Sequence, residues 1–71
     1  MSKRLKEQAP SRSVEEIGPG DYVKVRGRLE RVVSNTAQGA EHTPRHWTVQ
    51  TESGSYGMFD IARYAKSGDV E

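Results

Sequence analysis

The strongest constraint on the fold is a period of two in the apolar residues, which occur in short runs that end at glycine. Val23 and Val25 alternate with more polar neighbours until the run ends at Gly27, and residues 47–50 repeat this alternation. Because successive side chains of a strand point to opposite faces, this period is typical of strands with one buried face. We therefore predict an all-β fold. The side chains predicted to share its interior are Val23, Val25, Trp47, Val49 and Phe59.

Turn signals divide the chain into five short strands. Gly54 marks a tight turn within residues 52–55, because glycine readily adopts the positive φ that such hairpins require. Residues 35–45 are polar and contain glycine and proline, which favours a loop. Residues 60–64 suit a single helical or 3₁₀ turn before the last strand. The predicted strands are residues 22–26, 29–34 (with Leu29, Arg31 and Val33 on one face), 47–50, 56–59 and 64–66. This order predicts a small closed barrel, which removes open sheet edges.

The two ends of the chain differ from this middle part. Residues 1–12 hold four cations against one acid and show no apolar period, so we expect a disordered basic arm. Ser13 and Glu16 fit a capping box that begins a short helical turn. Residues 18–20 (Gly-Pro-Gly) then end this turn, since proline disfavours helix before it. We place the barrel at residues 13–67 and expect a flexible C-terminus at 68–71.

Composition limits the possible functions. A chain of 71 residues, 32% of them apolar, forms one domain at most with a thin core, so we expect a monomer or a weak homo-oligomer. A net charge of +1 predicts no strong overall attraction to polyanions. The chain has no cysteine, which excludes disulfides and thiolate metal sites. No apolar stretch is long enough for a signal peptide or a membrane span, so we expect a soluble cytoplasmic protein without membrane contact.

The glycine and valine pattern resembles a known class of small barrels. Residues 20–27 read Gly-Asp-x-Val-x-Val-x-Gly, followed by Trp47-x-Val49 and by Gly54-x-Tyr56. This pattern is similar to bacterial SH3-like barrels of the KOW and Tudor type over residues 17–66. The KOW pattern usually has a second glycine a few residues after the first, where this chain has residues 29–31 (Leu-Glu-Arg). The resemblance implies an SH3-like barrel, whose fold alone does not assign a function.

A second resemblance is to the plasmid-encoded type II dihydrofolate reductases. These are SH3-like barrels of similar length with a disordered N-terminal arm, and they form a tetramer around a shared pore. The segment that holds their ligands corresponds to residues 56–59 here. Gly57 stands where those enzymes have an amide, and Phe59 lacks the hydroxyl group. Since the chain also shows no nucleophile elbow and no phosphate-binding loop, we predict that it is not an enzyme and uses no cofactor.

The residues most able to carry a function are the cations of the first predicted hairpin. Tyr22, Lys24 and Arg26 are expected on the outward face of the first strand. Guanidinium and ammonium groups beside aromatic rings suit contact with phosphates and stacking on bases. The alternative is a solvated face whose cations pair with Glu15, Glu16, Glu30 and Glu52. The residues predicted to bind nucleic acid are Lys24, Arg26, Arg28, Arg31, Arg45, Arg63 and Tyr56.

Three other sites are considered on the sequence. A protein-interaction barrel, of phage or mobile-element type, would use the 35–45 loop and exposed tyrosines. The Tudor resemblance implies a methylated-cation cage formed by Tyr56, Phe59, Tyr64 and Asp60. His42 and His46 are four residues apart, but Pro44 between them disfavours the helix that would bring both rings to one metal ion. We therefore predict a non-enzymatic binding module for nucleic acid or protein, with no metal site.

Overall fold

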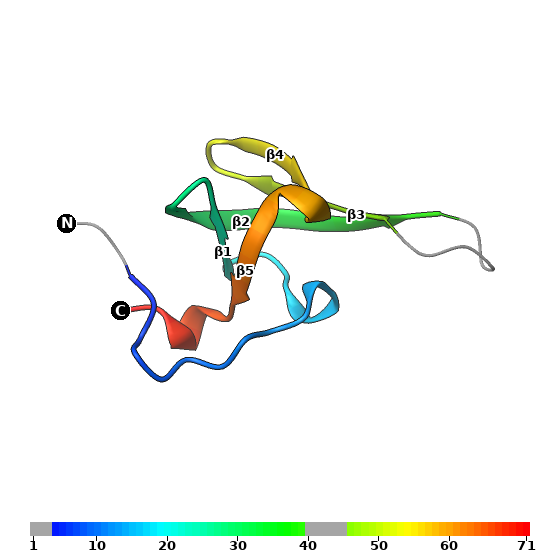
Figure 1. The fold of residues 1–71 in the computed structure, drawn as a ribbon. Coiled ribbons are helices and arrows are strands. Elements are labelled where there is room, and N and C mark those ends of the chain that lie inside the picture. The colour runs from blue at the N-terminus through cyan, green and yellow to red at the C-terminus, as the bar shows by residue number, and fades with distance from the viewer. Residues whose placement is uncertain (1–3, 40–45) are drawn as a thin grey trace.

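A computed structural model describes residues 4–39 and 46–71. These residues form five antiparallel strands in one sheet of order β4-β3-β2-β1-β5, with three 3₁₀ turns (Figure 1). The strands are β1 (Tyr22–Val25), β2 (Arg28–Gln38), β3 (His46–Thr51), β4 (Gly54–Gly57) and β5 (Ile61–Ala65). The turns are η1 (Val14–Glu16), η2 (Met58–Asp60) and η3 (Ser67–Asp69). The prediction of an all-β domain is confirmed, and no helix of the described ranges could span a membrane.

The longest strand, β2, belongs to two hairpins. Its first part pairs with β1, from Arg28 opposite Val25 to Arg31 opposite Tyr22. Its second part pairs with β3, and the register shifts between Val32 and Ser34. Residues 35–38 are therefore strand, although the sequence predicts a loop at 35–45; the cross-strand pairs with β3 stabilise these polar residues as strand. The prediction for residues 40–45 lies outside the described residues.

The core is built from valines of the central strands. Val23, Val25 and Val49 are completely buried, as predicted, and Val32 joins them. Trp47 is half-buried and packs against this core. The prediction for Phe59 is wrong, because its side chain is 84% exposed. Phe59 lies in η2 rather than in a strand, so the period of two that was applied to residues 56–59 does not reach it.

The two faces of the first hairpin are buried to different extents. Val32 is completely buried, because it lies on the same face as Glu30 and its partner Val23, whereas Val33 on the other face is 48% exposed. Tyr22 is buried, although it was expected on the outward face. The 3₁₀ turn before the last strand is confirmed, but it lies at 58–60, and β5 begins at Ile61, which is buried opposite Val25.

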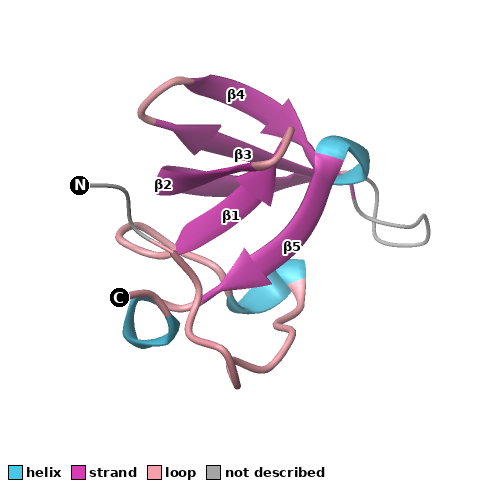
Figure 2. Cartoon of the chain, turned by 60° about the vertical axis from the view of Figure 1, so that its left-hand side comes forward, coloured by secondary structure: helices cyan, strands magenta, loops and turns pink. Residues whose placement is uncertain are grey.

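The short connection η2 forces the sheet to curl. Strands lie about 4.8 Å apart, so a flat sheet would separate β4 from β5 by about 19 Å. The chain between them runs only from Gly57 to Ile61, and these four residue steps reach at most about 14 Å. The two edge strands must therefore approach each other at this end (Figure 2). No pairing between described residues joins β4 to β5, so the sheet is curled and open.

The two ends of the described chain lie side by side, where the sequence predicts a mobile arm and a flexible C-terminus. Leu5 forms an antiparallel bridge with Val70, and the amide of Lys6 donates to the Asp69 carbonyl at 2.8 Å (Figure 1). The guanidinium of Arg12 pairs with the Asp69 carboxylate at 3.0 Å. We call this arrangement of residues 4–12 and 66–71 the terminal clasp.

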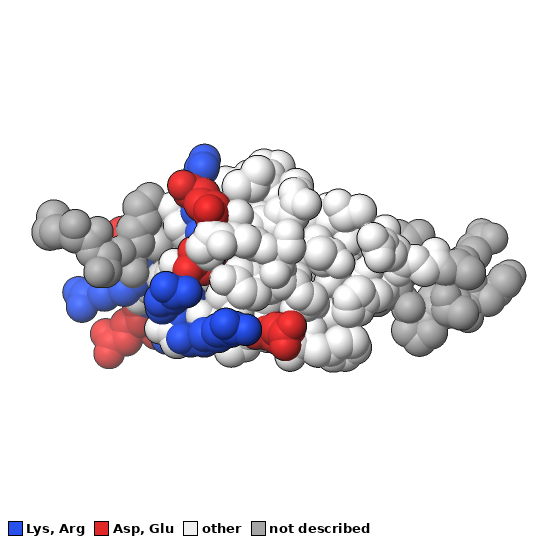
Figure 3. All heavy atoms as spheres, turned by 90° about the horizontal axis from the view of Figure 1, so that it is seen from above, with Lys and Arg blue, Asp and Glu red and all other residues white. Residues whose placement is uncertain are grey.

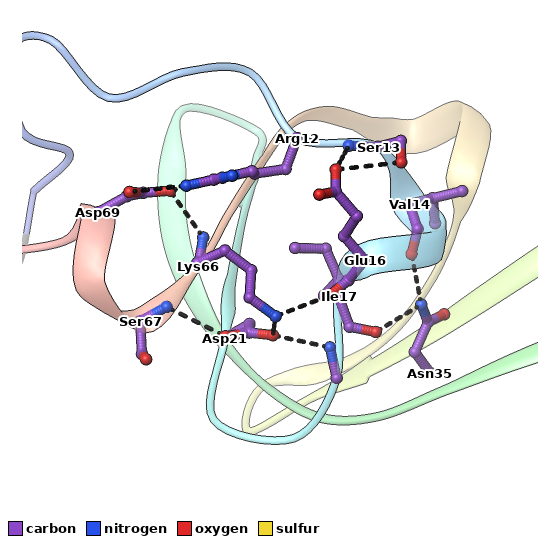
Figure 4. A network of polar contacts seen from close by, with 11 residues as sticks. Arg12, Ser13, Val14, Glu16, Ile17, Asp21, Asn35, Lys66, Ser67 and Asp69 are labelled. Carbon is purple, nitrogen blue, oxygen red and sulfur yellow. Dashed lines mark hydrogen bonds and ion pairs between the residues drawn. The ribbon is translucent and has the colours of Figure 1, made fainter.

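A buried carboxylate fastens the terminal clasp to the sheet (Figure 4). Asp21 is 6% exposed and accepts hydrogen bonds from the Lys66 ammonium at 2.8 Å and the Ser67 amide at 3.0 Å. The amide of Gly18 donates to it at 2.9 Å. Burial alone would raise the pKa of Asp21, but these hydrogen bonds outweigh it and hold the pKa below its usual range.

The turn η1 forms where the capping box predicts it. The amide and the hydroxyl of Ser13 both donate to one Glu16 carboxylate oxygen, at 2.9 and 3.2 Å. The Asn35 amide group of β2 then donates to the carbonyls of Val14 and Ile17, at 2.9 and 3.1 Å (Figure 4). These bonds join η1 to the sheet.

Candidate functional site

The tip of the β1–β2 hairpin has an unusual backbone. Arg26 and Gly27 connect the paired residues Val25 and Arg28, and both have positive φ, +52° and +77°. A two-residue hairpin turn with positive φ at both positions is normally filled by Asn-Gly or Gly-Gly. Arginine in a left-handed conformation costs about 1–2 kcal/mol, because its Cβ approaches the following carbonyl oxygen. Of the residues that the structure describes, Arg26 is the only one other than glycine with positive φ.

Five cations lie on or beside this hairpin, four of the hairpin itself and one of the N-terminal segment, and they are not all on one face of the sheet. Strand register places Lys24 opposite Leu29 on one face of the hairpin. Arg31 lies on the same face, two residues after Leu29 in β2. Arg28 lies opposite Val25 at the end of the hairpin and therefore on the other face, and Arg26 extends the tip. Arg4 and Lys24 line a hollow of about 180 Å³ beside Leu29. We call Arg4, Lys24, Arg26, Arg28 and Arg31 the basic hairpin surface.

Three of these five cations have acidic partners. Arg28 pairs with Glu30 and Arg31 with Glu52, each at 3.7 Å, and Arg4 pairs with Glu71 at 3.1 Å. The three arginine side chains are 53–82% exposed, so each pair contributes only about 0–1 kcal/mol. Lys24 and Arg26 are exposed and have no acidic partner among the described residues. The alternative prediction, a solvated face whose cations all pair with glutamates, therefore holds for the partners Glu30 and Glu52. It does not hold for Lys24 and Arg26, which have no acidic partner in the described chain.

Seen from above, the molecule has a charged and an uncharged half. Lys, Arg, Asp and Glu side chains gather at the end that holds the termini, with both signs interspersed (Figure 3). The other half is white in this view, and residues 32–39 and 46–51 of the long hairpin contain none of these four residue types. The site thus combines a patch of mixed charge with a neutral neighbouring surface.

The remaining predicted site residues lie elsewhere. The Arg63 guanidinium donates to the Ala9 carbonyl, and its buried Nε has no hydrogen-bond partner within the described part of the chain. Although Arg63 is opposite Lys24 in the β1–β5 register, its side chain is thus engaged by the N-terminal segment. Tyr56 lies on β4, separated from β1 by β3 and β2, and packs against the core. Arg45 is outside the described residues.

The tyrosines do not form an exposed set. Tyr22 is buried, and Tyr56 and Tyr64 are half-buried against the core. The Tyr64 hydroxyl donates to the Met58 carbonyl at 3.3 Å, and burial raises the pKa of this phenol. The expectation of exposed tyrosines is thus wrong for Tyr22. The predicted loop of the interaction barrel is strand at residues 35–38.

The exposed aromatic group is instead Phe59 in η2. Its ring centroid lies 5.6 Å from that of His46, at an interplanar angle of 35°. The His46 ring fits here because residue 57 is glycine: a Cβ at that position would come within 3.3 Å of the imidazole Nε2. Sequence analysis did not predict this pair, because it placed Phe59 in the core and considered His46 only as a metal ligand. Gly57, directly before Met58, was the available signal that the strand ends there.

The described residues contain no group of three or more His, Cys, Asp or Glu side chains that could hold a metal ion. His42, the partner considered for His46, is outside the described residues. Comparisons with protein-family models, with curated proteins and with solved structures gave no significant match to this chain. The basic hairpin surface and η2 are therefore the two features of this chain from which a function can be inferred.

Proposed function

We propose that this protein is a non-enzymatic module that binds nucleic acid, with the cations of the basic hairpin surface contacting phosphates. The observation that carries the proposal is Arg26. A cation is kept at the tip of a hairpin in a conformation that favours asparagine or glycine, and it makes no ion pair within the described chain. Backbone strain at an exposed position supports a functional interpretation, because nothing in packing requires arginine there.

The loose ion pairs of Arg28 and Arg31 are consistent with this role. Arg28 and Arg31 can exchange a carboxylate at 3.7 Å for a phosphate oxygen with little loss, since both pairs are exposed to solvent. Guanidinium groups bind phosphate through two parallel hydrogen bonds. The hollow between Arg4 and Lys24 offers a place where one phosphate would meet two cations.

The finer fold assignment belongs to the same proposal. The strand order, the curl of the sheet and the 3₁₀ turn before β5 support an SH3-like barrel of the KOW or Tudor type. Binding residues are often found on loops and turns that a rigid scaffold positions. A cytoplasmic location is also proposed, as the place where such a module would meet nucleic acid.

The test is a comparison of single charge removals by fluorescence anisotropy with a labelled oligonucleotide. Lys24→Ala and Arg26→Gly are each expected to weaken binding about threefold to tenfold and to lower the salt slope by about one. Lys6→Ala is the matched control, because it removes an exposed charge outside the basic hairpin surface; less than a twofold change is expected. The proposal is wrong if the natural protein shows no salt-dependent binding, or if Lys6→Ala weakens binding as much as Lys24→Ala.

Val33 favours a second candidate function, a protein-interaction domain. This side chain is 48% exposed beside the register shift of β2, on the uncharged half of the molecule. A partner that covers Val33 would bind with little dependence on salt, in contrast to a polyanion. Substitution of Val33 by serine would then abolish capture, whereas Lys24→Ala would leave it unchanged.

A further inference from the structure

We infer that the nucleic acid is single-stranded, and that one of its bases stacks on the exposed ring of Phe59. This inference builds on the proposed function: the basic hairpin surface holds phosphates, and η2 adds a platform for a base. It makes Phe59 a contact residue that sequence reasoning had assigned to the core. The ligand class follows from three observations on the described residues.

The first observation is the state of the Phe59 side chain. In a small domain with a thin core, phenylalanine is among the most valuable side chains to bury. Here the ring is 84% exposed even though His46 lies at a centroid distance of 5.6 Å. His46 packs beside the ring and over Gly57, so the ring is held from one side and open to solvent on the rest of its surface. An aromatic ring in this position can stack with any base, because every base has a π face.

The second observation is that the platform lies near the cationic tip. Val25 is paired with Ile61, Arg26 follows Val25, and Phe59 precedes Ile61 by two residues. Cα atoms of cross-strand partners are about 5.5 Å apart, and each further residue adds at most 3.8 Å. The Cα atoms of Arg26 and Phe59 are therefore within about 17 Å. Both lie at the end of the β1–β5 pair where β5 begins (Figure 2), within reach of one short run of nucleotides.

The third observation is the charge pattern beside Phe59. The neighbouring strand β3 and the second half of β2 carry no Lys, Arg, Asp or Glu (Figure 3). A strand bound at the basic tip would therefore find further cations only on the charged half. In η2 the Phe59 ring offers a surface that suits a base, and Asp60 beside it is the one charged side chain of this turn. In a duplex both faces of a base are already stacked. Only an unpaired base can reach the ring, which selects single-stranded nucleic acid.

The experiment uses three fluorescein-labelled probes with equal numbers of phosphates: a twelve-nucleotide oligo(dT), a duplex, and an abasic strand. The natural protein is expected to bind oligo(dT) at least fivefold more tightly than the other two probes. Phe59→Ala is expected to remove this preference while leaving the affinity for the abasic strand within twofold. Phe59→Trp, which keeps a stacking surface, is expected to restore it. Because Phe59 is 84% exposed, both variants are expected to unfold at the same temperature as the natural protein.

The outcomes separate the two proposals. If no probe binds, the proposed function itself is wrong. If all probes bind with equal affinity and Phe59→Ala changes nothing, phosphate binding stands and the stacking inference is overturned. Preference for the duplex, or an equal loss of all three probes in Phe59→Ala, would also overturn it, because a stacking contact affects only the probe with unpaired bases.

Discussion

Two charged residues of this protein are in opposite situations. Asp21 is buried, with its carboxylate satisfied by the Lys66 ammonium and by two backbone amides. Arg26 is exposed, strained and without an ion-pair partner in the described chain. A buried charge that is fully hydrogen-bonded supports the fold, whereas an exposed charge in an unfavourable conformation contributes nothing evident to stability. Asp21 therefore stabilises the fold, whereas Arg26 is the charge that the proposed function uses.

Asp21→Asn tests the structural use. The amide keeps the size of the side chain but removes the negative charge, so Lys66 loses its carboxylate partner and one backbone amide loses an acceptor. We expect the free energy of unfolding to fall by about 2 kcal/mol, measured by urea denaturation at pH 7. Asp60→Asn is the matched control, because Asp60 is exposed, and its effect is expected to stay within about 0.5 kcal/mol. Equal effects of the two substitutions would contradict this role for Asp21.

Single residues also show what the sequence could predict. The alternation around Val23, Val25 and Val49 is a direct consequence of strand geometry, and all three are buried as expected. Phe59 has the same apolar character but is exposed, because η2 ends the alternation before it. Tyr22 is buried, although the residue two positions along the same face of the strand, Lys24, is exposed. Hydrophobic period predicts which face of a strand is buried only as long as the strand continues without a break.

At the scale of elements, the β1–β2 hairpin joins a tight turn to the cations on which the proposed function depends. Gly27 suits its positive φ, while Arg26 does not. The sequence predicts the turn from Gly27, and it predicts the cations on the flanking strands. It does not predict that Arg26 is itself left-handed, since arginine is rarely found there. Nor does it predict Arg4 in the site, because the bridge between Leu5 and Val70 joins the two ends of the chain.

Arg26→Gly separates the two properties of this hairpin. Glycine relieves the left-handed strain but loses more conformational entropy on folding, so we expect a net stabilisation of about 0.5–1 kcal/mol. The same variant is expected to bind oligonucleotide more weakly. Arg26→Lys keeps both the charge and the strain and is expected to leave stability unchanged. Urea denaturation and anisotropy on the same samples give both values, and a destabilised Arg26→Gly variant would contradict the strain argument.

At the scale of the whole molecule, carboxylates of low pKa stabilise the terminal clasp and the neighbouring turn η1. The Arg12 guanidinium lowers the pKa of Asp69, and the Ser13 amide lowers that of Glu16. Asp21, which joins the clasp to β1, also has a lowered pKa because its hydrogen bonds outweigh its burial. The sequence contains these residues, but Arg12 and Asp69 are 57 positions apart and Asp21 and Lys66 are 45 positions apart. The prediction of a mobile arm was based on the composition of residues 1–12 alone. Local composition carries no information about contacts with residues 66–71.

These three carboxylates predict that the fold is lost in acid. A pKa that is lower in the folded than in the unfolded chain means that the unfolded chain takes up protons first as the pH falls. The stabilisation is fully present above the unfolded values, near 3.8 for aspartate and 4.5 for glutamate, and disappears as the pH drops through the lower folded values. Urea midpoints measured from pH 7 to pH 2 are expected to stay level to about pH 5 and then to fall. In Asp21→Asn the urea midpoint at pH 7 should be lower than in the natural protein. It should also fall less steeply as the pH drops, because one of the three titrating carboxylates is gone. A parallel decline in both proteins would show that Asp21 does not contribute to this acid sensitivity.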